Sequence, residues 1–329
     1  MGTFPSGRNA YYDPMLSQFS SAAFSRTGGN MVADQIAPAV PAPKQSALYR
    51  VFDPEAWLKT PNDLRAPKTV PDRVTFTTSS ATFFCHNRAL SAEIALEDLA
   101  NSDQAMMLRE NHSELVVTQL KRAQEVRVAR LCTASGNAAT IVQATGAGLW
   151  TAVDSADILG QTNSAHIGIW NLTGMRPNTV VLDWESALLA QRNRFLLDLF
   201  RYTQGGQIPL ERLRTDVFKV ERLIIADAIQ NTAGEGATMA NSSIWGACCL
   251  FCYSNPGAAS DMSPNFLTRF RWNPEGMPYR AGNGDVLALA TFRSVYDKAG
   301  EAKVEVIESG YYQDERVTGS PMAYLLKPR

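Results

Sequence analysis

The cysteines near the end of the chain have a spacing that could support chemistry. Cys249-Leu-Phe-Cys252, preceded by Cys248, resembles a redox pair or half of a zinc site. The surrounding apolar run, residues 244–253, predicts a buried strand, on which residues three apart point to opposite faces. Two such thiols cannot readily bind one metal ion, and the sequence has no second pair with this spacing. We interpret these cysteines as small buried hydrophobic residues.

Cys85 and His86 place a thiol next to an imidazole, but neighbouring residues on a strand rarely bring a nucleophile and a base together. The other histidines, His112 and His166, do not form an HxxxH or HxH pattern with it, and no phosphate-binding GxxxxGK[ST] loop occurs. We therefore expect no catalytic residue, no metal site and no bound cofactor, and predict a protein that is not an enzyme.

Composition and charge limit the class of protein further. The chain has 329 residues, of which 45% are hydrophobic, and 31 Lys and Arg balance 32 Asp and Glu. This length predicts about two domains. A strongly basic nucleic-acid binder is excluded, so any contact with DNA is expected to be weak and local. An odd count of five cysteines and an N-terminus unlike a secretory signal predict synthesis in a reducing cytoplasm.

Residues 1–47 have a composition unlike that of the remaining chain. Aromatic residues are followed by prolines at positions 38, 41 and 43, which favour extended backbone. Such a segment cannot form its own core, so it predicts an N-terminal arm that docks on a neighbouring molecule. The aromatic residues expected to make contacts there are Tyr11, Tyr12, Phe19 and Phe24.

Residues 48–90 contain two short runs of alternating residues, 74–77 and 81–84, on either side of Ser79-Ser80. This pattern predicts a β-hairpin with its turn at the serines, and its polar approach indicates that it projects from the body. We expect Phe76, Phe83 and Phe84 to bury apolar surface against an adjacent subunit.

The rest of the chain predicts an α/β core beside one long helix. Residues 104–132 have no Gly or Pro and apolar residues at helical spacing, which predicts a helix of roughly 40 Å. Buried strands are expected at residues 179–182, 220–226, 244–253, 304–308 and 323–326, with helices following Trp184 and Pro209.

An ordered series of segments resembles the major capsid proteins of tailed bacteriophages with the HK97 fold. The resemblance runs from about residue 31 to the end of the chain. It rests on Met31–Pro41, Tyr49-Arg-Val-Phe52, Arg176–Leu182, Tyr202–Gln207, Val220–Ile225, Asn231-Thr-Ala233 with Glu235-Gly236, Ile244-Trp-Gly246, Phe270-Arg-Trp272 and Ala323–Lys327.

The resemblance implies an α+β fold with five segments in chain order. They are an N-terminal arm (1–47), an extended β-hairpin loop (48–90), a peripheral domain with the long spine helix (91–150), an axial α/β domain (151–294) and closing strands that return to both domains (295–329). It also implies a structural protein that self-assembles into an icosahedral shell around double-stranded DNA.

The partners implied are further copies of the chain in hexamers and pentamers, weakly contacted DNA, and scaffolding, portal and decoration proteins. The implied location is the virion capsid, with no membrane contact. Two alternatives stay open: an encapsulin-like nanocompartment shell, and a cytosolic enzyme that uses Cys85 or the cysteines at 248–252.

Overall fold

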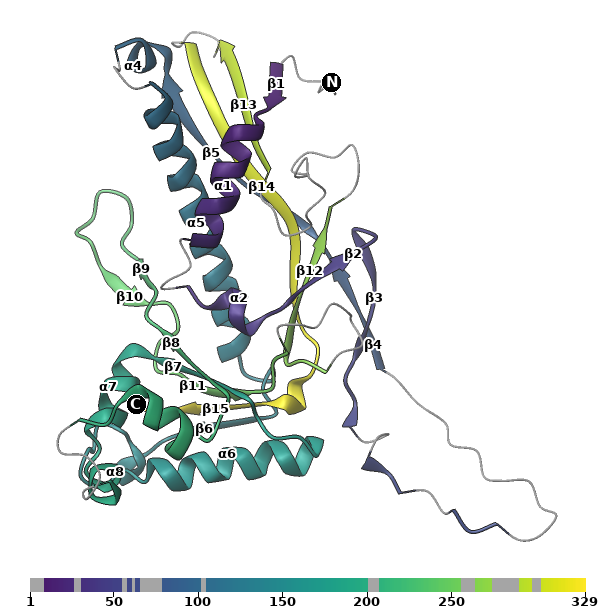
Figure 1. The fold of residues 1–329 in the computed structure, drawn as a ribbon, viewed down its shortest axis with the longest axis vertical. Coiled ribbons are helices and arrows are strands. Elements are labelled where there is room, and N and C mark those ends of the chain that lie inside the picture. Colours follow the sequence, from purple (N-terminus) through teal and green to yellow (C-terminus); the bar gives the residue numbers. More distant parts are fainter. Residues whose placement is uncertain are drawn as a thin grey trace.

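The computed structural model of the protein has two packed parts linked by long strands (Figure 1). The structure describes residues 9–26, 31–54, 58–60, 63–65, 79–101, 105–200, 207–255, 264–273, 290–297 and 303–329. The two parts are called the spine part, which is built on a six-stranded sheet, and the base part, which is built on a five-stranded sheet.

Helix α5 (Ala105–Thr133) is the main support of the spine part and matches the long helix predicted from sequence. Its 29 residues include no helix-breaking Gly or Pro. One face of the helix is buried, and Val116, Val117 and Leu120 pack against Tyr311 of the sheet. The helix therefore lies along the sheet over much of the length of the spine part (Figure 1).

Strand β14 (Lys303–Val317) organises the six-stranded sheet because three other strands pair with it. The sheet order is β1-β13-β14-β12-β2, and β5 also pairs with β14. The bounds of these strands are Asn9–Tyr12 for β1, Ala290–Asp297 for β13, Leu267–Trp272 for β12, Ala39–Ala42 for β2 and His86–Ala95 for β5. Because β12 and β13 belong to this sheet, the predicted axial boundary at residue 294 lies too late in the chain.

The N-terminal segment packs on its own subunit, which differs from the predicted arm. Strand β1 pairs with β13, helix α1 (Pro14–Arg26) lies along α5, and β2 runs parallel to β12. Val32, Ile36 and Ala37, around the short helix α2 (Ala33–Ile36), are almost fully buried in the core. These three residues are covered by other parts of the same chain.

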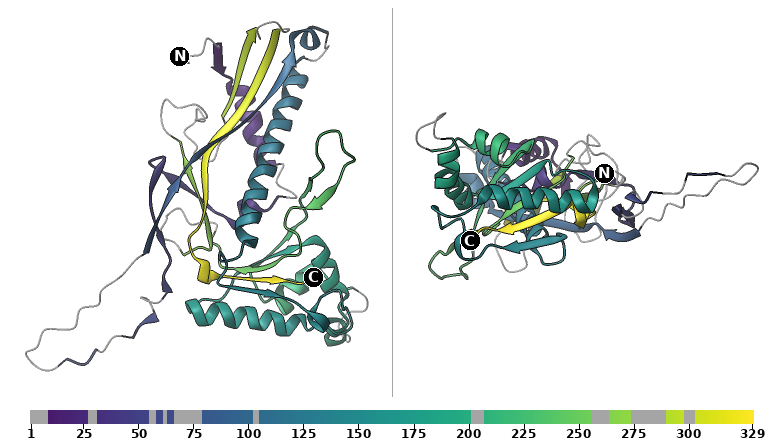
Figure 2. Two further views of the ribbon diagram at one scale, coloured as in Figure 1. Left: turned by 180° about the vertical axis from the view of Figure 1, so that it is seen from behind. Right: turned by 90° about the horizontal axis from the view of Figure 1, so that it is seen from below.

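The base part is a sheet of order β6-β15-β11-β7-β8 with helices beside it (Figure 2). Every residue of β7 and β11 is buried, as expected for strands covered on both faces. The strands are β6 (Thr140–Gln143), β15 (Ala323–Lys327), β11 (Cys249–Cys252), β7 (Thr179–Asp183) and β8 (Arg222–Ala226). The strand predicted over 244–253 is thus shorter than expected.

Three helices of the base part begin at side-chain caps. Asp157 caps α6 (Ile158–Thr173), which ends at Gly174 with a left-handed φ of 68°. In the same way, Asp183 caps α7 (Trp184–Arg192) and Asn193 caps α8 (Arg194–Leu199). The remaining short elements are α4 (Leu96–Asn101) in the spine part, and α9 (Leu210–Arg212), a π-helical turn over Leu213–Val217, and 3-10 turns at Gly146–Gly148 and Ser320–Met322.

Two ribbons extend from the body of the molecule. Strands β3 (Ser46–Val51) and β4 (Ser79–Phe84) form one, and β9 (Ile229–Asn231) and β10 (Asn241–Ser243) form the other. The predicted turn at Ser79-Ser80 is wrong, because both serines lie inside β4, opposite Val51 and Arg50. The earlier run at 74–77, with Phe76, lies outside the described residues.

The helices among the described residues include none with the length and apolar character needed to cross a membrane.

Candidate assembly site

The β3–β4 ribbon has two faces with different surroundings. Ala47 pairs with Phe83 in the register, and Tyr49 lies two residues along on the same face. On this face Phe83 stacks on Phe270, with ring centroids 4.3 Å apart, and Tyr49 lies 5.2 Å from the same ring. The apolar cluster joins the root of the ribbon to strand β12.

Polar contacts hold the end of β4 in a fixed direction. The amide of Phe84 donates a 2.9 Å hydrogen bond to Asp314 Oδ2, and Arg316 Nε lies 2.7 Å from the same oxygen. At the other strand, the amide of Phe52 donates to the carbonyl of Thr318. The ribbon leaves the body on the side away from α5 as a supported extension of the sheet (Figure 2).

The opposite face of the ribbon exposes apolar side chains. Ser46 pairs with Phe84, and Leu48 lies two residues from Ser46, so Leu48 and Phe84 share this face. Leu48 is 66% exposed and Phe84 is 43% exposed. One face of the ribbon packs on its own subunit, and the other exposes the apolar side chains of Leu48 and Phe84. Such a ribbon is suited to covering another molecule.

The seven predicted assembly residues occupy different environments. Phe83 is buried in its own subunit and is not available to a neighbour, whereas Phe84 is exposed beside it. Phe19 is half-buried on α1. Tyr11 and Tyr12 lie in β1, paired with Arg293 and Phe292, and Phe24 lies in α1. Phe76 is outside the described residues. Sequence reasoning missed Leu48, because its alternation with Tyr49 is visible only once β3 is known to pair with β4.

The first half of the N-terminal segment is attached to the spine part by apolar and hydroxyl contacts. Leu16 is 1% exposed and packs with Ile94, Leu99 and Ile307. Buried hydroxyl groups add hydrogen bonds one turn further along α1. Ser20 Oγ lies 2.6 Å from Ser113 Oγ of α5 and accepts a hydrogen bond from Thr291 Oγ1 of β13. This half is therefore part of the subunit's own core.

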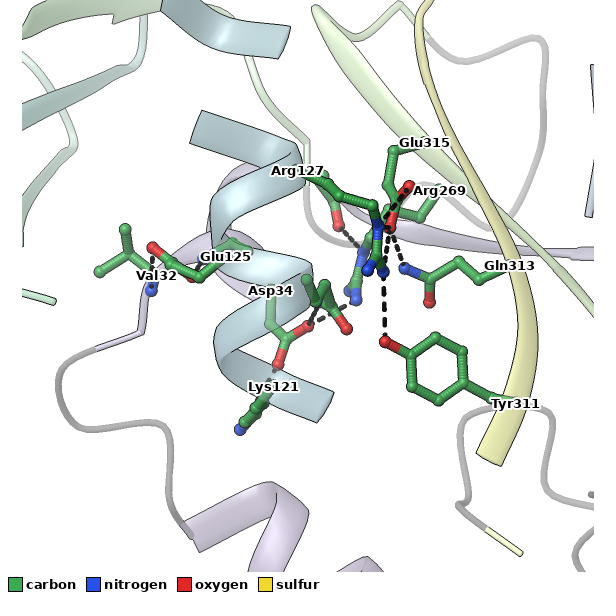
Figure 3. A network of polar contacts seen from close by, with 12 residues as sticks. Val32, Asp34, Lys121, Glu125, Arg127, Arg269, Tyr311, Gln313 and Glu315 are labelled. Atoms are coloured by element: carbon green, nitrogen blue, oxygen red, sulfur yellow. Dashed lines mark hydrogen bonds and ion pairs between the residues drawn. The ribbon is translucent and has the colours of Figure 1, made fainter. Parts of the chain in front are cut away.

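The carboxylate of Glu125 joins three regions of the chain, and Figure 3 shows its contact with Val32. Its Oε1 accepts hydrogen bonds from the amide of Val32 and from Trp245 Nε1, and its Oε2 accepts from the amide of Ala33. Burial raises the pKa of Glu125, and these three donors oppose that shift. The side chain connects α5 both to the N-terminal segment and to the base part.

Asp34 lies between two cations at the start of α2 (Figure 3). Its carboxylate contacts the Arg269 guanidinium and Lys121 Nζ, the latter at 3.6 Å, and accepts a 2.7 Å hydrogen bond from Gln124. Burial alone would raise the pKa of Asp34, but Arg269 and Lys121 outweigh it and hold the pKa below its usual value. The ion pairs connect α2 to both α5 and β12.

Arg127 and Glu315 form a second buried ion pair between α5 and β14 (Figure 3). The Arg127 guanidinium donates to both carboxylate oxygens at 2.8 to 3.2 Å and to Tyr311 Oη at 3.3 Å. Burial opposes ionisation of Glu315, but the bonds from Arg127 hold its pKa below the usual value. With the Arg109–Glu305 pair, these contacts add two ion pairs to the apolar packing between helix and sheet.

The cysteines match the structural interpretation from sequence. Cys248 and Cys252 lie in one apolar cluster and Cys249 in the cluster on the other face of the sheet. All five cysteines are free and buried, and burial raises the pKa of Cys85 and of Cys252 to about 12. Within the described ranges, no group of His, Cys, Asp and Glu could hold a metal ion.

Comparison with known proteins relates this architecture to viral shells. No protein-family model matches the chain. The chain is 23% identical over 266 residues to the major capsid protein of Pseudomonas phage JBD67, which covers 79% of this chain and 83% of that protein.

Solved structures match over a larger share of the chain. A phage-related protein from Bordetella bronchiseptica superposes with a TM-score of 0.70 at 19% identity, over 96% of this chain and 97% of the other. The capsid subunit of cyanophage P-SCSP1u superposes with a TM-score of 0.55 at 13% identity, over 88% of this chain and 86% of that subunit. The chain has the HK97 capsid fold.

The HK97 fold accounts for the parts described above, and the resemblance to phage major capsid proteins is confirmed. The long helix α5 is its spine helix, the β3–β4 ribbon is its extended loop, and the five-stranded sheet is the core of its axial domain. In this chain, the spine helix is fixed to the sheet by buried ion pairs and to the axial domain by Glu125.

Proposed function

We propose that this chain is the major capsid protein of a tailed bacteriophage and that its copies assemble into the icosahedral shell around a double-stranded DNA genome. The observation that carries the proposal is the match to a phage major capsid protein over most of the chain, together with the HK97 fold over nearly all of it. The protein then acts as a building block and not as an enzyme.

The two-faced ribbon supports a mechanism for assembly. Leu48 and Phe84 are apolar and exposed on one face, while Phe83 anchors the other. Burying such side chains yields about 25 cal/mol per Å² of apolar surface removed from water. One ribbon gives a weak contact, and the contacts of many subunits sum to a stable shell whose single steps remain reversible.

The partners of the proposed shell are those that the resemblance to phage capsid proteins implies. Copies of the chain form hexamers and pentamers, and scaffolding, portal and decoration proteins complete the particle. The subunit is made in the host cytoplasm and then resides in the virion capsid. The near balance of 31 basic and 32 acidic residues favours weak, sequence-independent contact with the enclosed DNA.

Electron microscopy of the chain expressed alone, after size-exclusion chromatography, tests the shell proposal. Closed particles or rings of five or six subunits are expected. A chain that stays a small oligomer with every candidate scaffold present, under conditions in which it is folded, would contradict it.

An encapsulin-like nanocompartment is the alternative with the same fold. The SrpI encapsulin of Synechococcus elongatus superposes with a TM-score of 0.50 at 12% identity, over 89% of this chain and 85% of that chain. Particles purified from the native host distinguish the two, because a phage shell contains DNA and a nanocompartment contains protein.

The thiol-enzyme alternative conflicts with the chemistry of the cysteines. A reactive thiol needs access to solvent and a lowered pKa, whereas the five thiols here are buried and their pKa values are raised. Titration with a thiol reagent is expected to label none of them quickly in the folded chain and all five after unfolding. Rapid labelling of one thiol in the folded chain would support the enzyme.

A further inference from the structure

A pocket of about 510 Å³ opens at the edge of the five-stranded sheet where β7 and β8 begin. Its walls include Arg176, from the loop after α6, and Lys219, from the turn before β8. Arg222, at the start of β8, completes a group of three basic residues, and Glu221 is the one acidic residue that lines the pocket.

The floor of the pocket is fixed by Asn178. Its side chain donates a 2.9 Å hydrogen bond to the carbonyl of Ser254 and accepts one of 2.9 Å from the Ser254 amide. The backbone carbonyl of Asn178 accepts hydrogen bonds from the amides of Glu221 and Arg222, at 3.1 and 3.0 Å. These bonds hold the ends of β7, β8 and β11 together, so the backbone that carries the basic residues is fixed.

The three basic residues keep their charge free for a ligand. The Arg222 guanidinium donates to neutral oxygens, those of Thr179 Oγ1 and of the Ser254 and Gln35 carbonyls. Arg176 and Lys219 are exposed and have no carboxylate partner among the residues that the structure describes. The lining thus combines three positive charges with one negative charge.

Lys219 adopts a backbone conformation that is uncommon for a residue with a side chain. Its φ of 52° lies in the left-handed region and, within the described chain, is the one such value outside glycine. The turn is held by the amide of Val220, which donates to the carbonyl of Arg214. Such a conformation persists where surrounding contacts impose it, and it often marks a functional position.

The neighbouring His166 lies close enough to Lys219 and Arg176 for their charges to affect its pKa. Its Nε2 lies 2.8 Å from the carbonyl of Phe218. Burial lowers the pKa of His166, and the charges of Lys219 and Arg176 lower it further. Both cations therefore act on one region of the axial domain.

We propose that this pocket binds the backbone phosphates of nucleic acid without reading base sequence. Guanidinium and ammonium groups are the usual partners of phosphate, and the fixed floor spares part of the entropy of ordering. Contacts of its cations to phosphate carry no information about base sequence. This inference rests on the proposed function, because it assigns to one site the DNA contact that a near-neutral shell subunit makes.

The test compares two double variants of the full-length chain. Arg176→Gln with Lys219→Gln removes two pocket charges, and Arg130→Gln with Arg192→Gln removes two exposed charges elsewhere. Binding of labelled duplex DNA of two unrelated sequences to unassembled subunits is followed by fluorescence anisotropy between about 50 and 200 mM salt. Pyrophosphate and a glutamate-rich peptide serve as competitors.

The pocket variant is expected to lose affinity for both DNA sequences by about 10- to 100-fold at 0.1 M salt, with a salt slope shallower by about 1.8. Pyrophosphate should compete with the DNA, and the control variant should bind as the original chain does. Equal binding by both variants would overturn the proposal. Binding of pyrophosphate without DNA would assign a small-anion site instead, and displacement by the peptide with no effect of the variants on DNA would assign a protein partner.

Shell formation is scored separately on the same preparations. If the original chain forms shells while the pocket variant binds DNA normally, the pocket proposal fails and the capsid function stands. If no preparation forms shells even with every candidate scaffold present, but DNA binding depends on the pocket, the capsid function fails and the phosphate site stands.

Discussion

The indole Nε1 of Trp245 donates a 2.6 Å hydrogen bond to Glu125 Oε1, and both side chains are buried. Trp245 belongs to the loop that leads into β11, and Glu125 is in the C-terminal third of the spine helix. The same carboxylate binds the amides of Val32 and Ala33. One side chain thereby sets the position of the axial domain and of the N-terminal segment relative to the spine helix.

Replacing Glu125 by Gln should destabilise the subunit by about 1–3 kcal/mol. The amide has one accepting oxygen, so at least one of the three buried N–H donors loses its partner. Urea denaturation followed by tryptophan fluorescence measures the change. Glu110→Gln, on the same helix but half-exposed, is the matched control and should change stability by less than about 0.5 kcal/mol. Equal losses for both variants would show that the contacts of Glu125 are not responsible.

Phe83 and Phe84 are adjacent residues on opposite faces of the extended loop, so their alanine variants should separate stability from assembly. Phe83→Ala removes a ring stacked on Phe270 and should cost about 3–5 kcal/mol of unfolding free energy. Phe84→Ala removes an exposed ring and should leave stability within about 0.5 kcal/mol while reducing shell yield. Urea denaturation and particle counts by electron microscopy check the pair. Normal shells from the Phe84 variant would contradict its assembly role.

The N-terminal helix supplies a second matched pair. Leu16 is 1% exposed and Met15 is 71% exposed. Leu16→Ala should lower the unfolding free energy by about 2–5 kcal/mol, and Met15→Ala by much less. Thermal unfolding of unassembled subunits measures both. A Leu16 variant as stable as the original chain would mean that the helix does not pack on its own subunit in solution, as the sequence had predicted for an arm.

Asp34 should make the subunit sensitive to acid. Its folded-state pKa is below the ordinary 3.8, so its contribution to stability is complete above that pH and is lost as the pH falls through the folded-state value. Glu125 changes stability in the opposite direction, because its folded-state pKa is above 4.5 and its contribution to stability is lost as the pH rises through that folded-state value.

Urea unfolding of the original chain at a series of acidic pH values should show a loss of stability as the pH falls, and this loss should be smaller in Asp34→Asn. The same variant should be less stable at pH 7 by about 2 kcal/mol, because the buried Lys121 and Arg269 lose their ion pairs with the Asp34 carboxylate. An unchanged acid slope in the variant would contradict the role of Asp34.

Local patterns predicted the elements that depend on neighbours in sequence. The helix expected over 104–132 is α5, and the strand expected over 179–182 is β7, because a run free of Gly and Pro and a run of buried apolar residues are visible in sequence. The opposite orientation of Cys249 and Cys252 also follows from strand geometry alone.

Long-range pairing was beyond what sequence patterns show. Strand β4 pairs with β3, which lies far earlier in the chain, so Ser79-Ser80 was mistaken for a turn. Residues 1–47 were predicted to dock on another molecule, because nothing local indicates that the same chain buries Val32 and Ile36. The phosphate pocket joins residues from three separate segments of the chain, and no spacing of Arg176, Lys219 and Arg222 reveals it.

Strand β14 also has a mechanical consequence. Its 15 residues extend over roughly 50 Å and pair with β13, β12 and β5. A pull along this strand loads its ladder of hydrogen bonds in shear, so the bonds resist together and do not open one after another. The spine part should therefore yield as one stiff unit, which would let a thin wall of such subunits withstand outward pressure from its contents.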